Sequence, residues 1–195
     1  SDVCSSDLGD PWQAVYVFDG DASTNVVCEG YAKAFKYLCD MTTFSGEISC
    51  VTVSGWMSGG TGAGPHMWNI VTMDDGNNYL VDVTNCDEGT VGAPDELFLT
   101  EYASGSAAEG YAFDCNGLLI LYAYDNDLSE VYNESDLLIS QNEYVDAHAT
   151  GHIAADVVRE NEIAATCTAE GSYDEVVYCS VCHEELSRET KSIDR

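Results

Sequence analysis

The stretch "NVVCEGYAKAFKYLCD", from Asn25 to Asp40, spaces its apolar residues as one face of a helix does. The residues of this face are Cys28, Tyr31, Ala32, Phe35, Leu38 and Cys39. They predict a helix over about 27–40 that begins directly after a polar loop, with Cys28 in its first turn. Unpaired cysteines are usually buried and inert, so Cys28 taken alone is better explained as a core residue than as a nucleophile.

The residues after this helix read as strands, because β-branched and aromatic residues gather there in short runs. Strands are predicted at 47–55, 66–73 and 78–85, and the turn signal "DDGNN" makes the last two an antiparallel hairpin. Further strands are predicted at 118–125 and 137–140. Before the helix, residues 10–20 predict a turn followed by a short aromatic and β-branched stretch.

Two residues of the predicted hairpin extend the interpretation of Cys28. A thiol nucleophile needs a base and a third group that orients the base, and a helix N-terminus stabilises the thiolate. His66 is the one histidine in this part of the chain, and Asp82 is a carboxylate inside an apolar run. An ordinary hairpin register places Asp82 nearer Ile70 than His66, so direct contact requires a bulge or a strong curl. Taken singly, each residue has a structural explanation.

Three blocks together resemble one family: "VCEGYAKAFKYLCD", then "HMWNIV", then "NYLVDVTNCD". They are similar to the transglutaminase-like superfamily of bacterial secreted proteins, over about Trp12 to Tyr144. The resemblance implies a papain-like α+β fold, in which a helix bearing the cysteine packs on an antiparallel sheet bearing the histidine and the aspartate. It implies Cys28 as nucleophile, His66 as general base and acid, and Asp82 as the residue that fixes the imidazole tautomer.

Other residues near the motif have lesser expected roles. Trp68 and Asn69 also match the resemblance, and we interpret them as packing and strand-positioning residues. Gln13 and Tyr16 remain alternative donors to the oxyanion. Gly30 is expected to let a substrate backbone approach the first turn of the helix.

The implied chemistry is acyl transfer on protein or peptide amides. Water as acceptor gives a cysteine peptidase or amidase, and a lysine amine gives a protein-glutamine transamidase; the motif does not decide between them. The alternative is a catalytically silent extracellular module that uses the same fold for binding or adhesion. No cofactor is expected for catalysis.

Composition limits the partners. The chain has 35 Asp plus Glu against 6 Lys plus Arg, with a formal net charge of -29, which repels phosphate backbones and excludes nucleic acid as an expected partner. No apolar run approaches the roughly 20 residues of a spanning helix, so membrane insertion is not expected. With the resemblance, this composition predicts a secreted or cell-surface protein. Its expected partners are a protein or peptide substrate, and further repeats or cell-wall components in a longer protein.

The composition changes near residue 146, and residues 146–195 are predicted to be a linker and a small cysteine-rich module. Such a module has too few apolar residues for a core of its own and usually needs a metal or disulfides. The predicted ligands of a structural Zn²⁺ are His152, Cys167, Cys179 and Cys182, with His183 as a competing ligand and a disulfide as the alternative. The segment resembles a short repeat found at the ends of Firmicutes surface proteins.

Two expectations remain. Residues 1–8, "SDVCSSDL", match what one frame of a common sequencing-adapter oligonucleotide encodes, so we expect them to be an artefact and leave them out of the fold. The first domain, 9–145, is then expected to be truncated at its N-terminus. Whether the remaining cysteines, Cys39, Cys50, Cys86 and Cys115, form disulfides stays open.

Overall fold

The computed structural model describes residues 12–21, 23–44, 46–61, 63–127, 131–146, 151–181 and 183–194. The chain forms two compact units, Ser1–Tyr144 and Val145–Arg195. The boundary from sequence lay one residue further along, between 145 and 146. No helix of the described residues is long and apolar enough to cross a membrane.

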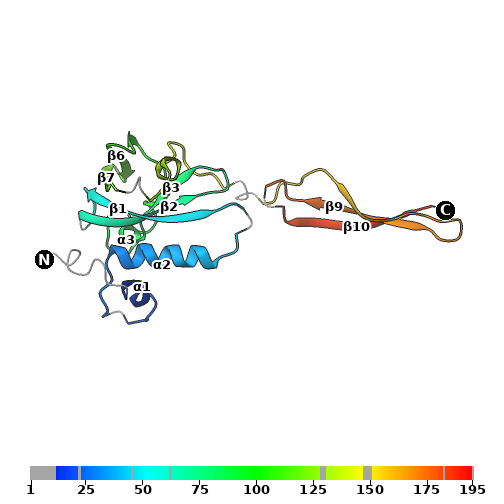
Figure 1. Cartoon of the computed structure of the whole chain (residues 1–195), viewed down its shortest axis with the longest axis horizontal. Helices are drawn as coiled ribbons and strands as arrows, with labels where there is room; N and C mark the ends of the chain where they lie inside the picture. The colour runs from blue at the N-terminus through cyan, green and yellow to red at the C-terminus, as the bar shows by residue number, and fades with distance from the viewer. Residues whose placement is uncertain are drawn as a thin grey trace. The chain divides into compact units, whose positions relative to one another are not determined.

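The first unit is α+β, with a mostly antiparallel sheet and few helices (Figure 1). Its seven strands have the order β4-β3-β2-β1-β7-β6-β5. They are β1 (Ser49–Ser58), β2 (Gly64–Thr72), β3 (Asn78–Val81), β4 (Phe98–Thr100), β5 (Ser104–Ser106), β6 (Gly110–Cys115) and β7 (Leu118–Tyr124). The central strands β1 and β2 pair antiparallel over nine residues each, from Ser49 opposite Thr72 to Met57 opposite Gly64.

Helix α2 (Cys28–Met41) begins and ends within one residue of the prediction, and packs against β1 and β2 (Figure 1). Phe35 and Cys39 on its apolar face join a cluster with Cys50, Val71 and Tyr79 of the sheet. The short helix α1 (Gln13–Tyr16) packs against α2. The N-terminal part of the predicted apolar face is buried, with Cys28 and Ala32 in the core, whereas Leu38 near its end is exposed.

A second apolar cluster includes Trp68, Ile70, Phe113 and Tyr122. Residues of β2 enter both clusters, since Ile70 belongs to this one and Val71 to the one beneath α2. A strand that is buried on both faces reads as a continuous apolar run, as "HMWNIV" does. The site described below lies where this strand begins.

Two predicted strands were wrong. The second hairpin strand was predicted to run to residue 85, but β3 ends at Val81 and the short helix α3 (Val83–Cys86) follows. Residues 137–140 form no strand, because Leu137 ends the 3₁₀ helix η2 (Glu134–Leu137) and the Asn78 side chain donates to the backbone carbonyls of Ser135 and Leu138. Helix α1 forms within residues 10–20, which were predicted as a turn followed by a short aromatic and β-branched stretch. Short apolar runs fit either conformation, so tertiary contacts decide.

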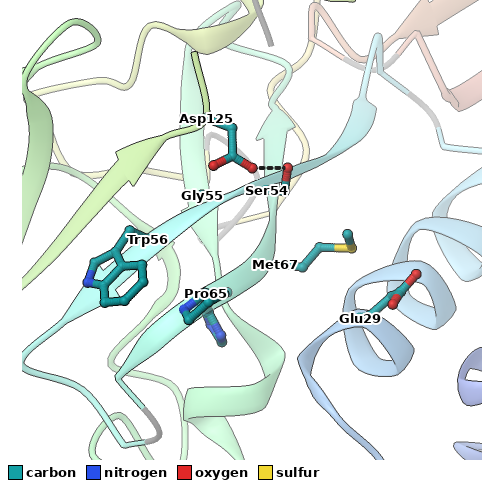
Figure 2. Close-up of a pocket in the computed structure, with 8 residues that line it drawn as sticks. Glu29, Ser54, Gly55, Trp56, Pro65, Met67 and Asp125 are labelled. Carbon is teal, nitrogen blue, oxygen red and sulfur yellow. Dashed lines mark hydrogen bonds between the residues drawn. The ribbon is translucent and has the colours of Figure 1, made fainter. Parts of the chain in front are cut away.

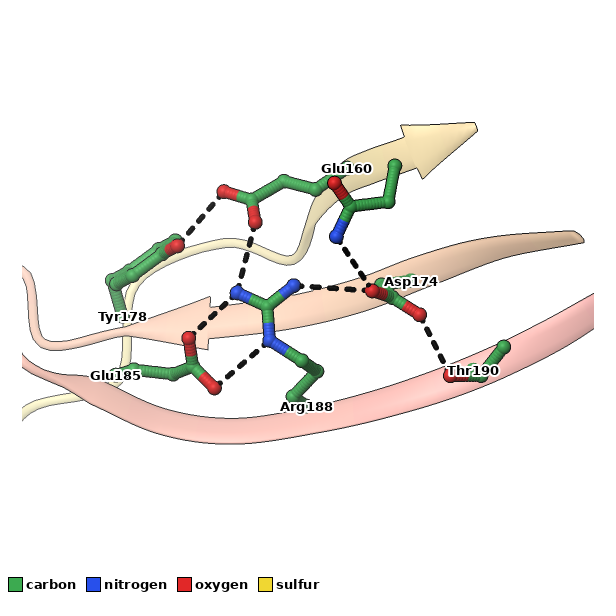
Figure 3. Close-up of polar contacts among 7 residues, drawn as sticks. Glu160, Asp174, Tyr178, Glu185, Arg188 and Thr190 are labelled. Carbon is green, nitrogen blue, oxygen red and sulfur yellow. Dashed lines mark hydrogen bonds and ion pairs between the residues drawn. The ribbon is translucent and has the colours of Figure 1, made fainter. Parts of the chain in front are cut away.

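The second unit is a three-stranded antiparallel sheet in the order β10-β9-β8. Its strands are β8 (Val158–Ile163), β9 (Gly171–Tyr178) and β10 (Glu185–Ile193). Most of its described residues are exposed or half-buried. Arg188 joins the three strands, with Nη2 2.9 Å from Glu160, Nη1 3.2 Å from Asp174 and a further pair to Glu185 (Figure 3). Polar contacts across the strands thus accompany a very small apolar core.

Candidate active site

His66 and Asp82 meet where β2 begins and β3 ends. The Nε2 atom of His66 lies 2.8 Å from Oδ2 of Asp82, and both side chains are buried. The ladder pairs Asn69 with Val81, so continuing it by one residue would set Asp82 opposite Trp68, two residues from His66. The predicted neighbour, Ile70, was therefore wrong. Asp82 reaches the imidazole because the chain leaves the strand there and Asp82 becomes the N-cap of α3.

Four hydrogen bonds hold the Asp82 carboxylate. Besides His66, its Oδ2 accepts from Asn85 Nδ2 at 2.6 Å and from the Tyr122 hydroxyl at 2.6 Å. Its Oδ1 accepts from the backbone N–H of Asn85 at 3.3 Å. A buried carboxylate needs such partners to stay charged. This one is bound by β7 and α3 as well as by the histidine.

Cys28 is the first residue of α2, and its side chain interacts with the His66 ring. The imidazole is bound to Asp82 through Nε2. Cys28, His66 and Asp82 therefore form one line of interacting side chains, from the helix N-terminus through the imidazole to the carboxylate. Cys28 is 0% exposed, so a substrate carbonyl reaches the sulfur only when the groups packed over it move apart.

The electrostatics of this line favour a charged histidine. Burial lowers the pKa of His66, but the hydrogen bonds and charges of Asp82 and Cys28 outweigh it and raise the pKa to about 9. Burial raises the pKa of Asp82, but His66, Tyr122 and Asn85 outweigh it and hold that pKa below its usual value. An imidazolium and a carboxylate are thus the favoured states near neutral pH, and an imidazolium beside a sulfur stabilises a thiolate.

Gln13 and Tyr16 lie differently. Gln13 is 3% exposed, and its Oε1 accepts the backbone N–H of Val27 at 3.0 Å, which brings its amide group to the N-terminus of α2. Tyr16, at the end of α1, lines another cavity together with Tyr31 and residues of the 17–26 loop. Of the two alternative donors, the structure places only Gln13 against the residue that precedes Cys28.

Gly30 has a different role from the one expected. A Cβ atom added to it would lie 2.7 Å from the carbonyl oxygen of Gln13 and 2.7 Å from Cγ1 of Val26. The space above Gly30 is therefore filled by α1 and the loop before α2, which leaves no room there for a substrate backbone. The glycine lets α1 approach the helix that carries Cys28.

Asn69 connects the strand of His66 to the helix of Cys28. Its buried Nδ2 donates to the carbonyl of Ala32, in α2, at 3.0 Å and to Thr52 Oγ1, in β1, at 3.0 Å. Trp68 packs edge-on against Tyr122 with ring centroids 5.1 Å apart. These contacts give Asn69 and Trp68 the positioning and packing surroundings that the sequence interpretation assigned to them.

A cavity of about 450 Å³ opens beside His66. Figure 2 shows side chains from α2, β1 and β2 around it, with Glu29 on one side and Trp56 on another. Its lining residues are Glu29, Ser54, Gly55, Trp56, Pro65, His66, Met67 and Asp125. Asp125 accepts from Ser54 Oγ at 2.7 Å, and Glu29 pairs with Lys33. Two carboxylates thus line a cavity that includes the imidazole.

In the part of the chain that the structure describes, the predicted zinc ligands do not lie together. Cys167 lies in the turn between β8 and β9, while Cys179 directly follows β9. The eight residues of β9 separate them by roughly 25 Å at about 3.3 Å per residue, whereas zinc ligands lie about 2.3 Å from one ion. His152 and His183 lie at the Cys179 end, since Ser180 N–H donates to Ile153 O and His183 N–H to Cys179 O.

Cys182 lies outside the described residues. Among those that are described, no group of three or more metal-ligating side chains is assembled. The four-residue zinc set is therefore corrected in one respect: Cys167 lies too far from Cys179 to share an ion with it.

Two members of the candidate site were missed in the sequence, Tyr122 and Asn85. Tyr122 stands in the apolar run "LLILYAY" and reads as core, and Asn85 reads as the end of a strand.

Comparison of the chain with models of known families, with curated proteins and with solved structures found no match in any of the three. The assignment of function therefore depends on the geometry of the site.

Proposed function

We propose that the chain is a thiol acyl-transfer enzyme with a transglutaminase-like core, secreted or attached to the cell surface, that acts on protein or peptide amides. The supporting observation is the buried His66–Asp82 hydrogen bond of 2.8 Å, together with Cys28, which interacts with the same imidazole from the first turn of a helix. A nucleophile, a base and a group that orients the base are the minimum for this chemistry.

In the proposed reaction, the Cys28 sulfur attacks the carbonyl carbon of an amide, and the new S–C bond turns the carbonyl oxygen into an oxyanion. The backbone N–H of Cys28 and the amide group of Gln13 are the candidate donors to that oxygen. His66 then gives its proton to the amide nitrogen as the C–N bond breaks, which leaves a thioester and a free amine.

The acceptor of the acyl group completes the reaction. Water deprotonated by His66 gives a carboxylic acid, and an amine deprotonated by His66 gives a new amide; either releases the Cys28 sulfur. Glu29 and Asp125 line the cavity beside His66, so their negative charges favour a cationic amine there over an anionic acceptor. We therefore place lysine-bearing proteins among the acceptors.

The second candidate function is a catalytically silent binding or adhesion module. It is favoured by one observation, the complete burial of Cys28. The two functions differ in what they require of the sulfur, because only the enzyme needs it to be ionised and reachable.

Alkylation with iodoacetamide, resolved by peptide mass spectrometry, separates the two functions. We expect Cys28 to react faster at neutral pH than the partly covered Cys39, and to lose that advantage in a His66→Ala variant. The exposed Cys167 serves as the reference for an accessible thiol in the same molecule. Equal rates for Cys28 and Cys39 that are also unchanged by His66→Ala contradict the enzyme.

The reaction itself is tested with a glutamine-containing protein and a fluorescent primary amine. Release of ammonia without incorporation indicates hydrolysis, and incorporation of the amine indicates transamidation. Cys28→Ala is the matched control, since it removes only the sulfur. Turnover that persists in Cys28→Ala contradicts the proposal.

A further inference from the structure

Tyr122 reaches the candidate site from a strand that the sequence motif does not include. Its hydroxyl donates to Asp82 Oδ2 at 2.6 Å, and the residue is 1% exposed. The ring is fixed on three sides, with centroids 5.1 Å from Trp68, 5.5 Å from Phe113 and 6.1 Å from His66. A side chain so enclosed holds its hydroxyl in one place.

Asn85 reaches the same oxygen from the other side. Its Nδ2 donates to Asp82 Oδ2 at 2.6 Å and lies 3.2 Å from the Met57 sulfur, while its Oδ1 accepts the N–H of Thr61 at 3.2 Å. Both ends of this buried amide are therefore occupied, which determines how it is turned. Oδ2 of Asp82 is the common acceptor of Tyr122, Asn85 and His66.

We propose that Tyr122 and Asn85 are positioning residues that hold the Asp82 carboxylate toward His66, as an extension of the site on which the proposed function rests. Asp82 has left the β3 ladder, so strand pairing alone does not fix its side chain. The hydroxyl and the amide replace that constraint. They act on the reaction only through Asp82.

The charged and titratable groups around this pair come from several elements. Cys28 of α2 faces His66, Cys86 of α3 and Tyr122 of β7 face Asp82, and Cys115 of β6 faces Tyr122. Glu29 and Asp125 line the cavity on the other side of His66. Burial and the Asp82 charge raise the pKa of Tyr122, so its hydroxyl stays protonated and remains a donor. Each variant in the test replaces one residue, so all the other groups around the pair stay the same.

The test is an NMR titration of the His66 ring in the full chain, with the resonance assigned through His66→Gln. Tyr122→Phe removes one oxygen atom and keeps the ring. We expect it to lower the titration midpoint of His66 by about one pH unit, because an opposite charge in contact shifts a pKa by about 1–3 units and a carboxylate no longer held toward the imidazole loses part of that effect. Asn85→Ala is expected to shift the midpoint in the same direction.

The matched control is Tyr124→Phe, on the same strand, whose hydroxyl donates to the Leu137 carbonyl at 2.9 Å and not to Asp82. It is expected to leave the midpoint unchanged. In an Asp82→Asn background, Tyr122→Phe is expected to have no further effect, because the partner charge is gone. A shift that is equal in Tyr122→Phe and Tyr124→Phe, or one that persists in the Asp82→Asn background, overturns the proposal.

Thermal melting of each variant identifies any that fails to fold. If Tyr122→Phe fails to fold, the titration midpoint of His66 is measured in Tyr122→Met instead, which also removes the hydroxyl. The titration needs no substrate. A chain that lacks acyl-transfer activity can therefore still show the coupling between Tyr122 and His66, and an active chain can still lack it.

Discussion

His66 Nε2 and Asp82 Oδ2 lie 2.8 Å apart although the two residues are 16 positions apart and only one of them belongs to a strand. The hairpin brings them near one another, and the exit of the chain after Val81 turns Asp82 into contact. The pair is buried, and Cys28 interacts with the same imidazole.

Replacement of Asp82 by Asn is expected to lower the pKa of His66 from about 9 toward its ordinary 6.5, because the charge that stabilises the imidazolium is removed. A reaction that needs protonated His66 then loses rate at a lower pH than in the unaltered chain. The alkaline limb of the acylation rate on an amide substrate measures this, because His66 must give its proton to the leaving amine. An alkaline limb at the same pH in both proteins contradicts the assigned role of Asp82.

The folded chain should lose stability as the pH rises from about 6.5 to 9. The pKa of His66 is raised on folding, so its contribution is fully present below 6.5 and disappears through 9. The expected loss in the free energy of unfolding is on the order of 1–3 kcal/mol. Urea unfolding at a series of pH values measures it. His66→Gln should flatten this part of the curve, and an equal slope in both proteins contradicts the prediction.

The pKa of Asp82 is lowered on folding, so the opposite sign applies to this carboxylate. Its contribution is present above pH 3.8 and is lost as the pH falls through the lowered value. The pair should therefore stabilise the fold most between about pH 4 and 6.5. The same urea series, extended to acid, checks this range against Asp82→Asn.

Gln13→Ala is expected to reduce the rate of acylation by about 100-fold if its amide donates to the oxyanion. Tyr16→Phe is expected to leave the rate within about twofold, because the tyrosine lines another cavity. Single-turnover kinetics on an activated ester measure the step directly. A larger effect from Tyr16→Phe than from Gln13→Ala reverses the assignment.

Cys39 and Cys50 are expected to form a disulfide under mild oxidation. Their thiols interact where α2 packs on β1, and neither residue belongs to the candidate site. With oxidised glutathione as oxidant, the two thiols lose two hydrogen atoms and the oxidant becomes two thiols. Burial raises the pKa of Cys50, so the reaction should be slow. The bond closes a short loop and should stabilise the fold by up to about 3 kcal/mol.

Peptide mapping identifies this bond, and Cys39→Ser is the control that prevents it. The free thiol of Cys50 should then remain alkylatable after unfolding. A disulfide that joins Cys50 to any other described cysteine contradicts the predicted pairing.

Zinc analysis of the full chain tests the corrected tail. Cys167→Ser is expected to leave the zinc content unchanged, because Cys167 lies at the opposite end of β9 from Cys179. Cys179→Ser is the companion variant at the other end. Loss of zinc in Cys167→Ser contradicts the separation of the two thiols.

The sequence alone predicted much of this protein where the signal is local. The spacing of Cys28, Tyr31 and Phe35 predicted α2 within one residue at each end, and the turn at 74–78 predicted the antiparallel hairpin. These features follow from side-chain periodicity and turn chemistry, which neighbouring residues determine. Cys28, His66 and Asp82 became candidates through the joint resemblance of three sequence blocks to one family, because each residue taken singly has a structural explanation.

Only the tertiary structure decided how these candidates meet and what surrounds them. Asp82 lies after its strand, Tyr122 arrives from β7, and α1 fills the space above Gly30. Each contact joins segments whose separation in the chain carries no periodic signal. In the tail, the length of β9 separates two cysteines that a ligand count had grouped. Local sequence determined which residues have the chemistry, and the packing of distant segments determined which of them touch.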